Sequence, residues 1–408
     1  MQAVGLARVN DRMSDSFAGA LAPVEYGYYF VIFYTVLGPP LGLILMGGIG
    51  SGFLLIPVLA YCFFALGSSV LTVLRTAWIP LACGTSYLLI QLALHGESMY
   101  GRYVYNFGPW LLSLVIVQAL AMHRPNFLHR FAWFTLFLGL GMLQFMKLTT
   151  FASYEKVSLE HGVGYANANA FASWFGFCVM YLTIKGYTET RPAYRLAAWL
   201  MAIGSLYVVT LTVSRGALLA MAISLLVASR QLLKVGLLPI VLLAGLAVGL
   251  SELGVFDQAI HAYTRRGTEE TGRLLVWPLL IEQFLNSPFI GNGASQAGAV
   301  TSTGVFVTPH NVFLLFAVAS GIVPLVLICA YYFRSGMAAL RAKAVDKDSM
   351  FYLPLVVYTV LITSADNLGF MTPWAIVSLA MPVAFSLSRM NRDDAGVRKN
   401  MLRPEEVR

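Results

Sequence analysis

Charged side chains are scarce in this sequence. Only 11% of its 408 residues are Asp, Glu, Lys or Arg, whereas soluble chains carry roughly 25%. Hydrophobic residues make up 58% of the chain. A membrane-spanning helix needs about 20 mostly apolar residues, so this content is sufficient for about twelve spans. The composition therefore excludes a soluble enzyme.

Several chemical signatures are also missing. The sequence has four cysteines, and each lies inside an apolar run: Cys62, Cys83, Cys178 and Cys329. We therefore expect neither a disulfide framework nor a cysteine metal site. The histidines lack metal-ligand spacing, which predicts a metal-free site. The glycine-rich residues 47–52 lack the Lys-Ser/Thr of a phosphate loop, so no nucleotide site and no cofactor are predicted.

Long apolar runs dominate what is present. In a bilayer the backbone must satisfy its own hydrogen bonds, so unbroken runs such as 235–250 predict helices. The sequence indicates an all-α polytopic membrane protein with about 12 transmembrane helices. The predicted spans are 26–47, 50–67, 76–95, 107–121, 131–149, 169–185, 196–213, 215–229, 235–251, 310–333, 351–366 and 370–388.

The positions of the basic residues predict the orientation of these spans. With both termini in the cytoplasm, 20 of the 27 Lys and Arg residues fall inside and seven fall outside, as the positive-inside rule requires. The net charge of +8 thus indicates topology and not nucleic-acid binding. The predicted parts are a cytoplasmic tail (1–25), spans one to nine (26–251), a large periplasmic loop (252–309), spans ten to twelve (310–388) and a second cytoplasmic tail (389–408).

The large external loop has mixed polarity. Within it, residues 272–287 group their apolar side chains around a few polar ones, which predicts an amphipathic helix near the membrane surface. Pro288, Gly291 and Gly293 follow and are typical of a turn. An extended segment should then lead back to the membrane at Thr308.

The end of this loop carries the first candidate site. Thr is a favoured N-cap and Pro a favoured first helical residue, so Thr308 and Pro309 predict that His310 lies in the first turn of a helix. The positive end of the helix dipole disfavours protonation, and a neutral imidazole can accept a proton. The alternative is that His310 is only an interfacial polar residue at the end of a span.

A second candidate lies where the predicted span 196–213 ends and the chain re-enters the membrane. Ser214 can cap the new helix, which places Arg215 at a positive helix end on the outer face. Together they would form an anion site. The alternative is an arginine that extends to lipid headgroups.

Three more external arginines lie in the large loop: Arg265, Arg266 and Arg273. Glu269 and Glu270 could neutralise them as ordinary surface ion pairs. Together with Arg215 and Lys147, however, they make up most of the external basic residues, and all of them could contribute to one anion-binding site. The planar guanidinium suits a diphosphate.

Two asparagines precede the span that begins near residue 169. Asn167 and Asn169 are two positions apart and so do not share a helix face. One could cap the helix while the other reaches into a cavity.

These features in combination resemble the bacterial O-antigen ligase family, over about residues 130–385. The resemblance rests on the twelve spans, the large loop before the tenth and these elements: Gly272-Arg273, Trp277, Ser287-Pro288, Gly291-Asn292-Gly293, His310-Asn311, Gly321, Arg215 with Leu219, and residues 164–169. Pro324 departs from the family pattern, which has a small residue there. O-antigen polymerases and O-linked protein oligosaccharyltransferases have similar architecture.

The resemblance implies a GT-C class glycosyltransferase of the bacterial inner membrane whose site faces the periplasm. It would transfer O-antigen from undecaprenyl diphosphate to a sugar hydroxyl of lipid A-core, with inversion and without a metal. His310 would be the general base. The diphosphate would be bound by Arg215, Arg265, Arg266 and Arg273. The site would be supported by Asn311, Asn167 and Asn169. The alternatives are a polymerase or protein oligosaccharyltransferase using the same donor and, as the least favoured, a lipid-linked glycan transporter.

Overall fold

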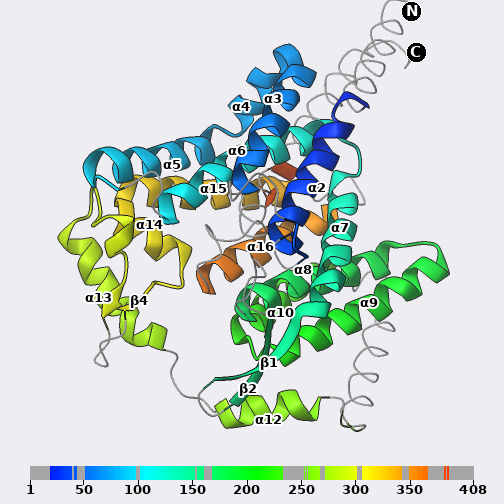
Figure 1. The fold of residues 1–408 in the computed structure, drawn as a ribbon. Coiled ribbons are helices and arrows are strands. Elements are labelled where there is room, and N and C mark those ends of the chain that lie inside the picture. Colours follow the sequence, from blue (N-terminus) through cyan, green and yellow to red (C-terminus); the bar gives the residue numbers. More distant parts are fainter. Residues whose placement is uncertain are drawn as a thin grey trace, which may run out of the picture.

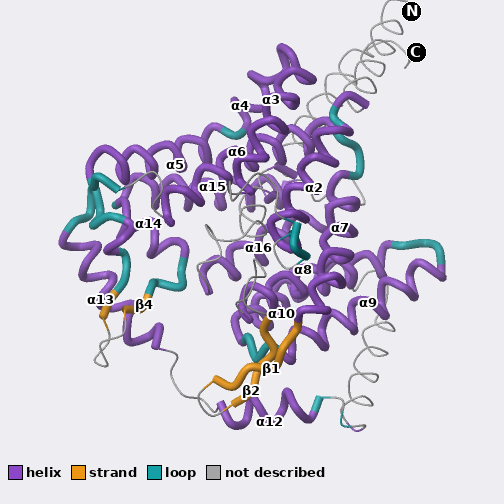
Figure 2. The backbone as a smooth tube through the Cα atoms, in the orientation of Figure 1, coloured by secondary structure: helices purple, strands orange, loops and turns teal. Residues whose placement is uncertain are grey.

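A computed structural model gives the fold of the chain, which is mostly helical (Figures 1 and 2). The structure describes residues 19–38, 41–43, 51–97, 102–151, 154–159, 168–232, 256–266, 272–300, 306–341 and 349–365, with the isolated positions 252, 254, 381, 382, 384 and 385. The helical class predicted from the sequence is confirmed over this part of the chain.

The N-terminal helices come first in chain order. They are α2 (Ala22–Leu37), η2 (Ser51–Leu54), α3 (Leu55–Leu66), η3 (Gly67–Ser69), α4 (Val70–Thr76), α5 (Trp78–Leu89), the π-helical turn η4 (Ile90–Leu94), α6 (Arg102–His123), α7 (Phe127–Met142) and η5 (Leu143–Phe145). A proline in the first turn favours the start of α2, because its missing N–H has no helical partner there.

The central elements follow. They are strands β1 (Met146–Phe151) and β2 (Tyr154–Leu159) and helices α8 (Ala168–Thr188), α9 (Pro192–Leu211) and α10 (Arg215–Leu232). Helix α8 is buried on nearly all sides, as expected for a helix that is apolar all round. It packs against α7, α9, α10 and α16 (Ser349–Ala365), so it forms the centre of the helical core.

The C-terminal elements carry the large loop. They are α12 (Asp257–Arg266), α13 (Gly272–Asn286), η6 (Ala294–Gln296), β3 (Ala299–Val300), β4 (Phe306–Val307), α14 (Val312–Ser320), α15 (Ile322–Arg341) and α16. The helix predicted over 272–287 is confirmed as α13. In Figure 1, α3 and α4 lie in the upper half of the view, whereas β4, β1, β2 and α12 lie in the lower half.

Three described helical stretches are long and apolar enough to cross a membrane: Gly52–Thr76, Pro192–Leu211 and Ile322–Arg341. Four shorter apolar helices accompany them: Trp78–Leu94, Phe107–His123, Arg215–Ala228 and Met350–Ala365. The number of twelve spans stays a prediction. The predicted span 235–251 and the predicted tail 389–408 lie outside the described residues. So do most of the span 370–388 and most of the tail 1–25.

Two predicted spans differ from the structure. The span 131–149 is wrong at its end, because α7 stops at Met142 and residues from Met146 pair with Tyr154–Leu159 as an antiparallel hairpin. Thr149 Oγ1 and Ser158 Oγ lie 3.1 Å apart on the face that also carries Lys147 and Lys156. The span 310–333 is two helices, because Gly321 adopts a φ of +80° between α14 and α15.

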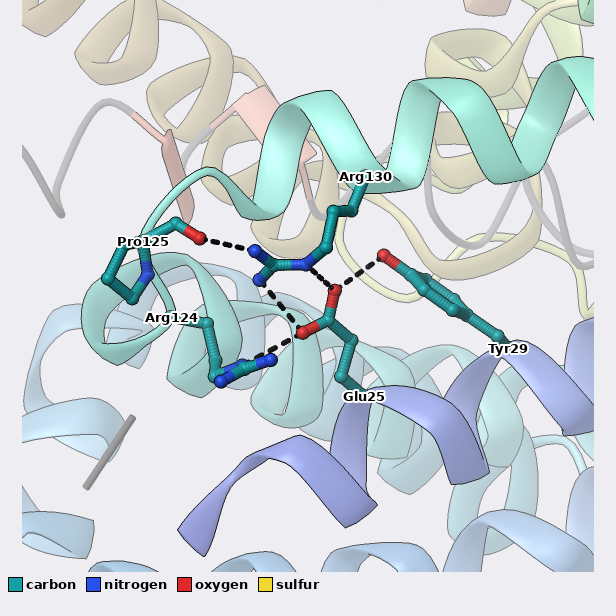
Figure 3. A network of polar contacts seen from close by, with 5 residues as sticks. All are labelled: Glu25, Tyr29, Arg124, Pro125 and Arg130. Atoms are coloured by element: carbon teal, nitrogen blue, oxygen red, sulfur yellow. Dashed lines mark hydrogen bonds and ion pairs between the residues drawn. The ribbon is translucent and has the colours of Figure 1, made fainter. Parts of the chain in front are cut away.

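A buried ion-pair cluster joins the start of α2 to the α6–α7 loop (Figure 3). Glu25 is 1% exposed and accepts from Arg124 Nε at 2.8 Å, from Arg130 Nε at 2.6 Å and from Tyr29 Oη at 2.9 Å. Burial raises the pKa of Glu25, but the hydrogen bonds from Arg130 and Arg124 outweigh it and hold that pKa below its ordinary value. Arg130 also donates to the Pro125 carbonyl at 2.7 Å.

Candidate functional site

His310 lies immediately before α14 and not in its first turn. The N-cap of α14 is Asn311, whose Oδ1 accepts from Leu314 N at 3.1 Å. The prediction that Thr308 caps the helix is therefore wrong. The expectation of a neutral imidazole depended on a first-turn position and loses that support, while Asn311 gains a defined role as the cap.

The backbone of His310 is held in the left-handed region, with a φ of +47°. This conformation is uncommon for a residue with a side chain and costs about 1–3 kcal/mol unless the surroundings fix it. His310 is half-buried. A strained residue beside a helix cap directs its side chain differently from its neighbours, and such residues cluster at functional sites.

Helix α13 fixes the segment just before His310. Trp277 Nε1 donates to the carbonyl of Pro309 at 2.9 Å, across 32 positions of sequence. The indole ring is half-buried, and its neighbours Val276 and Leu280 are 1% and 0% exposed. Trp277 thus contacts the residue that directly precedes His310.

The turn after α13 docks onto the α14–α15 corner through its main chain. Asn292 N donates to Val318 O at 2.7 Å, and Gly293 N donates to Ala319 O at 3.1 Å. In the opposite direction, Ile322 N donates to Pro288 O at 2.7 Å. These bonds join the turn and the corner as one unit, which also contains the end of the helix that starts after His310.

Two glycines make this docking possible. A Cβ on Gly321 would overlap the carbonyl of Phe289, and a Cβ on Gly291 would lie 2.5 Å from the carbonyl carbon of Ala319. Gly291 and Gly321 also have φ values of +69° and +80°, which side chains disfavour. The motif glycines are therefore required by close backbone approach and by conformation together.

Arg215 is the first residue of α10, as predicted, and is half-buried. Ser214 directly precedes it, and the Ser214 carbonyl accepts from Leu218 N at 3.2 Å. Orphan backbone N–H groups at a helix N-terminus attract anions. A half-buried guanidinium at this point adds a charged donor to them.

Val213 precedes this motif with a φ of +54°. For a β-branched residue this is a genuine outlier. Val213 is 1% exposed and packs against Ala262 and Tyr263 of α12. Nothing in the sequence pointed to Val213, because valine is among the residues least suited to this conformation.

The contact with Val213 brings α12 beside the start of α10. Arg265 lies on α12, three residues after the buried Ala262, and is exposed. Helix α12 also packs against β2 of the hairpin that carries Lys147 and Lys156. The structure therefore places the start of α10 and the β1–β2 hairpin next to α12, and a common anion site of the external basic residues stays a prediction.

The remaining predicted residues are less completely described. Arg266 ends α12 and Arg273 is the second residue of α13, and only their backbones are described. Asn169 is half-buried near the start of α8, and Asn167 lies outside the described residues. The contacts of these four side chains stay predictions.

Helix α16 connects the arginine region with the histidine region. It packs against α10, and a Cβ on Gly216 would lie 3.0 Å from Cβ of Ala365 at its C-terminal end. The same helix packs against α14, which begins directly after His310 and Asn311. Arg215 and His310 thus lie at the starts of α10 and α14, and both of these helices pack against α16.

Among the residues that the structure describes, no group of three or more His, Cys, Asp or Glu side chains is placed to hold a metal ion. The arrangement instead offers a histidine, a half-buried arginine and helix N-termini. Such groups can move a proton and bind an anion.

The comparison with protein families bears on this arrangement. Residues 196–329 match the model of the O-antigen ligase family. The family prediction made from the motifs is confirmed over about a third of the chain. The O-antigen ligase region contains Arg215, Arg265, His310 and Asn311 together with the Trp277–Pro309 contact. No curated protein matches the chain.

The O-antigen ligase match and the apolar helices together support a membrane protein of lipopolysaccharide biosynthesis, with an O-antigen ligase or related polymerase or ligase function. They also indicate lipid-linked glycan and lipid A-core substrates in general terms.

Proposed function

We propose that the protein is an inverting glycosyltransferase that transfers O-antigen polysaccharide from undecaprenyl diphosphate to a sugar hydroxyl of lipid A-core. The observation that carries the proposal is that α13 and the turn after it contact both ends of α14 within the O-antigen ligase region: Trp277 donates to the Pro309 carbonyl just before His310, and the turn 287–293 docks at Gly321. In the predicted topology this site faces the periplasm from the bacterial inner membrane, with both termini cytoplasmic.

His310 acts as general base in this proposal. Its imidazole takes the proton of the acceptor hydroxyl as that oxygen attacks C1 of the donor sugar. The bond between C1 and the diphosphate oxygen breaks, and its electron pair leaves with undecaprenyl diphosphate. Displacement from the opposite side inverts the anomeric carbon. General-base assistance typically contributes 10² to 10⁴ in rate.

Arg215 and the arginines near it bind the diphosphate. Charge builds on the leaving oxygen as the bond breaks, and preorganised donors stabilise that charge. The helix start at Arg215 and the contact of Val213 with α12 favour Arg215 and Arg265 for this role. Arg266 and Arg273 are assigned to it as members of the external basic cluster found in the sequence. The diphosphate linkage supplies the driving force, so the reaction needs neither a nucleotide nor a metal.

A polymerase or a protein oligosaccharyltransferase would use the same donor with another acceptor. The family match supports an O-antigen ligase or a related polymerase or ligase in general, and fold analogy does not separate the possible acceptors. Transport is less favoured, because transporters usually place charged sites near the bilayer midplane and show repeat symmetry.

Reconstitution separates these activities. Purified protein with undecaprenyl-diphosphate-linked glycan and lipid A-core, in the presence of EDTA, should give glycan-capped lipid A-core. Chain growth without lipid A-core would show a polymerase, and glycan on serine or threonine of an added protein would show an oligosaccharyltransferase. Strict dependence on a divalent metal would contradict the proposed mechanism.

A cell-based control uses a strain that lacks the protein. We expect unmodified core in the outer membrane and accumulated lipid-linked polymer. Shorter or absent lipid-linked polymer would instead favour polymerisation.

A further inference from the structure

A buried glutamine that precedes the O-antigen ligase region in the sequence contacts the turn that docks onto the α14–α15 corner. Gln91 lies in η4 and is 0% exposed. Its amide nitrogen donates to Ala319 O at 2.9 Å and to Ser320 Oγ at 2.6 Å. Its amide oxygen accepts from Ala294 N at 2.7 Å. Both N–H groups and the oxygen are thus satisfied across more than 200 positions of sequence.

Two neighbours of Gln91 contact the same turn. His95 Nε2 lies 2.8 Å from Ile290 O, and Glu97 Oε1 accepts from Ser295 N at 2.9 Å. A Cβ on Gly293 would lie 3.3 Å from the His95 ring. Residues 91–97, which we call the 91–97 segment, therefore cover the turn 290–295 with three side chains.

The local backbone explains how one short segment presents three side chains to one turn. His95 N donates to Ile90 O at 3.1 Å, which closes a π-helical turn, and Glu97 N donates to Gln91 O at 3.0 Å. A π-turn changes the helical phase at the end of α5, and such turns occur frequently at functional sites. Figure 1 shows α14 beneath the end of α5.

A buried glutamine is unusual in an apolar run, because burial of an amide without hydrogen-bond partners costs free energy. An apolar side chain at position 91 would pack without any such requirement. Gln91 instead bonds to Ala294 on one side of the docked turn and to Ala319 and Ser320 on the other. It bridges the turn and the α14–α15 corner at the point where Gly293 N also donates to Ala319 O.

We propose that Gln91, supported by His95 and Glu97, is a positioning residue that fixes the turn 290–295 against the end of α14 and thereby sets the placement of His310. This inference rests on the proposed function, since it assigns a task to the histidine loop. It places part of the site's support in residues before 196, outside the O-antigen ligase region.

Amide hydrogen exchange of the full-length protein in lipid nanodiscs tests the proposal without an activity assay. In Gln91→Leu, exchange of the amides in 290–296 should rise about tenfold, equivalent to about 1.4 kcal/mol. Peptides from α8 and α9 should exchange as in the wild type. Gln91→Glu keeps the acceptor for Ala294 N but turns a second, buried carboxylate oxygen toward Ala319 O, so its increase should be at least as large.

Gln118→Leu is the matched control. Gln118 is also buried, at 2% exposed, and donates to Thr76 Oγ1 at 3.1 Å in another part of the fold. It should leave exchange in 290–296 unchanged. Ser320→Ala removes one acceptor of Gln91 with less disturbance and covers the case in which Gln91→Leu does not fold.

Transfer kinetics form the second arm. Misplacement of a catalytic group by about 1 Å costs about 10²-fold in rate, so Gln91→Leu should lower kcat strongly and change the KM for the lipid-linked donor little. Unchanged exchange in 290–296, or an equal rise throughout the protein, would overturn the positioning role. Absence of transfer in the wild type would instead contradict the proposed function, and the exchange result would still decide the role of Gln91.

Discussion

Two polar clusters in different parts of the chain hold their surroundings together in different ways. In the first cluster, the buried Glu25 carboxylate pairs with Arg124 and Arg130, so opposite charges neutralise each other within the protein (Figure 3). Around the turn 290–295, the contacts are made by a primary amide, an imidazole, a carboxylate and main-chain groups, and Trp277 donates to the carbonyl just before His310. These hydrogen bonds of the second cluster are not ion pairs, because the Glu97 carboxylate accepts from a main-chain N–H.

This difference separates structural from candidate functional arginines. A buried charge needs a partner, and removal of the partner is destabilising. Arg124 and Arg130 pair with Glu25, and Arg215 lies at the start of α10 beside α12, where a helix N-terminus can bind an anion. Substitutions in the first cluster should affect stability, and substitutions in the second should affect transfer.

The largest expected effect is that of His310→Ala. Transfer should fall by about 10² to 10⁴, because the general base is lost, while the unfolding midpoint changes little. His261→Ala, at an exposed position on α12, is the matched histidine control. Single-turnover rates measure the effect, and a loss of less than fivefold would remove His310 from the base role.

Glu25→Gln should reverse this pattern. It leaves Arg124 and Arg130 without their carboxylate, at a cost of about 3 kcal/mol, the lower end for a buried pair because Arg130 is 37% exposed. Thermal unfolding in detergent measures it. The folded fraction should keep the wild-type transfer rate, and a large loss of transfer at unchanged stability would contradict the structural assignment.

The pH dependence of stability follows from the same cluster. The folded pKa of Glu25 is depressed, so its contribution is fully present above the unfolded value, about 4.3, and is lost as the pH falls through the folded pKa. Glu25→Gln should therefore reduce the dependence of the unfolding midpoint on acid pH. An unchanged acid dependence would exclude Glu25 as its source.

Arg215→Ala should have the smaller catalytic effect. Hydrogen bonds to charged groups contribute about 1.5–3 kcal/mol, which corresponds to about a 10- to 150-fold loss in kcat/KM for the lipid-linked donor. Arg215→Lys should recover only part of it, because the planar fork is lost. Arg191→Ala, at an exposed arginine over the Tyr194 ring, is the control, and full rescue by lysine would contradict bidentate binding.

The sequence predicted the helical class, the helix over 272–286 and the helix start at Arg215, because these depend on local apolar pattern and capping. It missed the β1–β2 hairpin, because β1 directly follows the apolar residues of α7 and residues 131–149 together have the composition of a single span. It also placed His310 one turn too far into the helix, since Thr308-Pro309 and Asn311 are both good starting signals and tertiary contacts decide between them.

The bracing of the site depends on contacts that no local pattern encodes. Gln91 reads as an isolated polar residue in a span, and its partners lie more than 200 positions away. Val213 has no sequence signal at all, because its left-handed backbone is imposed by packing against α12. Gly291 and Gly321 could be named from the motif, but their mutual close approach becomes visible only in the fold.

The central claim is that one lipid-linked diphosphate meets both His310 and Arg215. Electron cryomicroscopy of the protein in nanodiscs with an undecaprenyl-diphosphate-linked glycan tests this most directly. We expect the diphosphate at hydrogen-bond distance, about 2.7–2.9 Å, from the Arg215 guanidinium, with its sugar facing the His310 imidazole. A diphosphate bound beside Arg124 and Arg130, or His310 and Arg215 on opposite sides of the bilayer, would contradict the account.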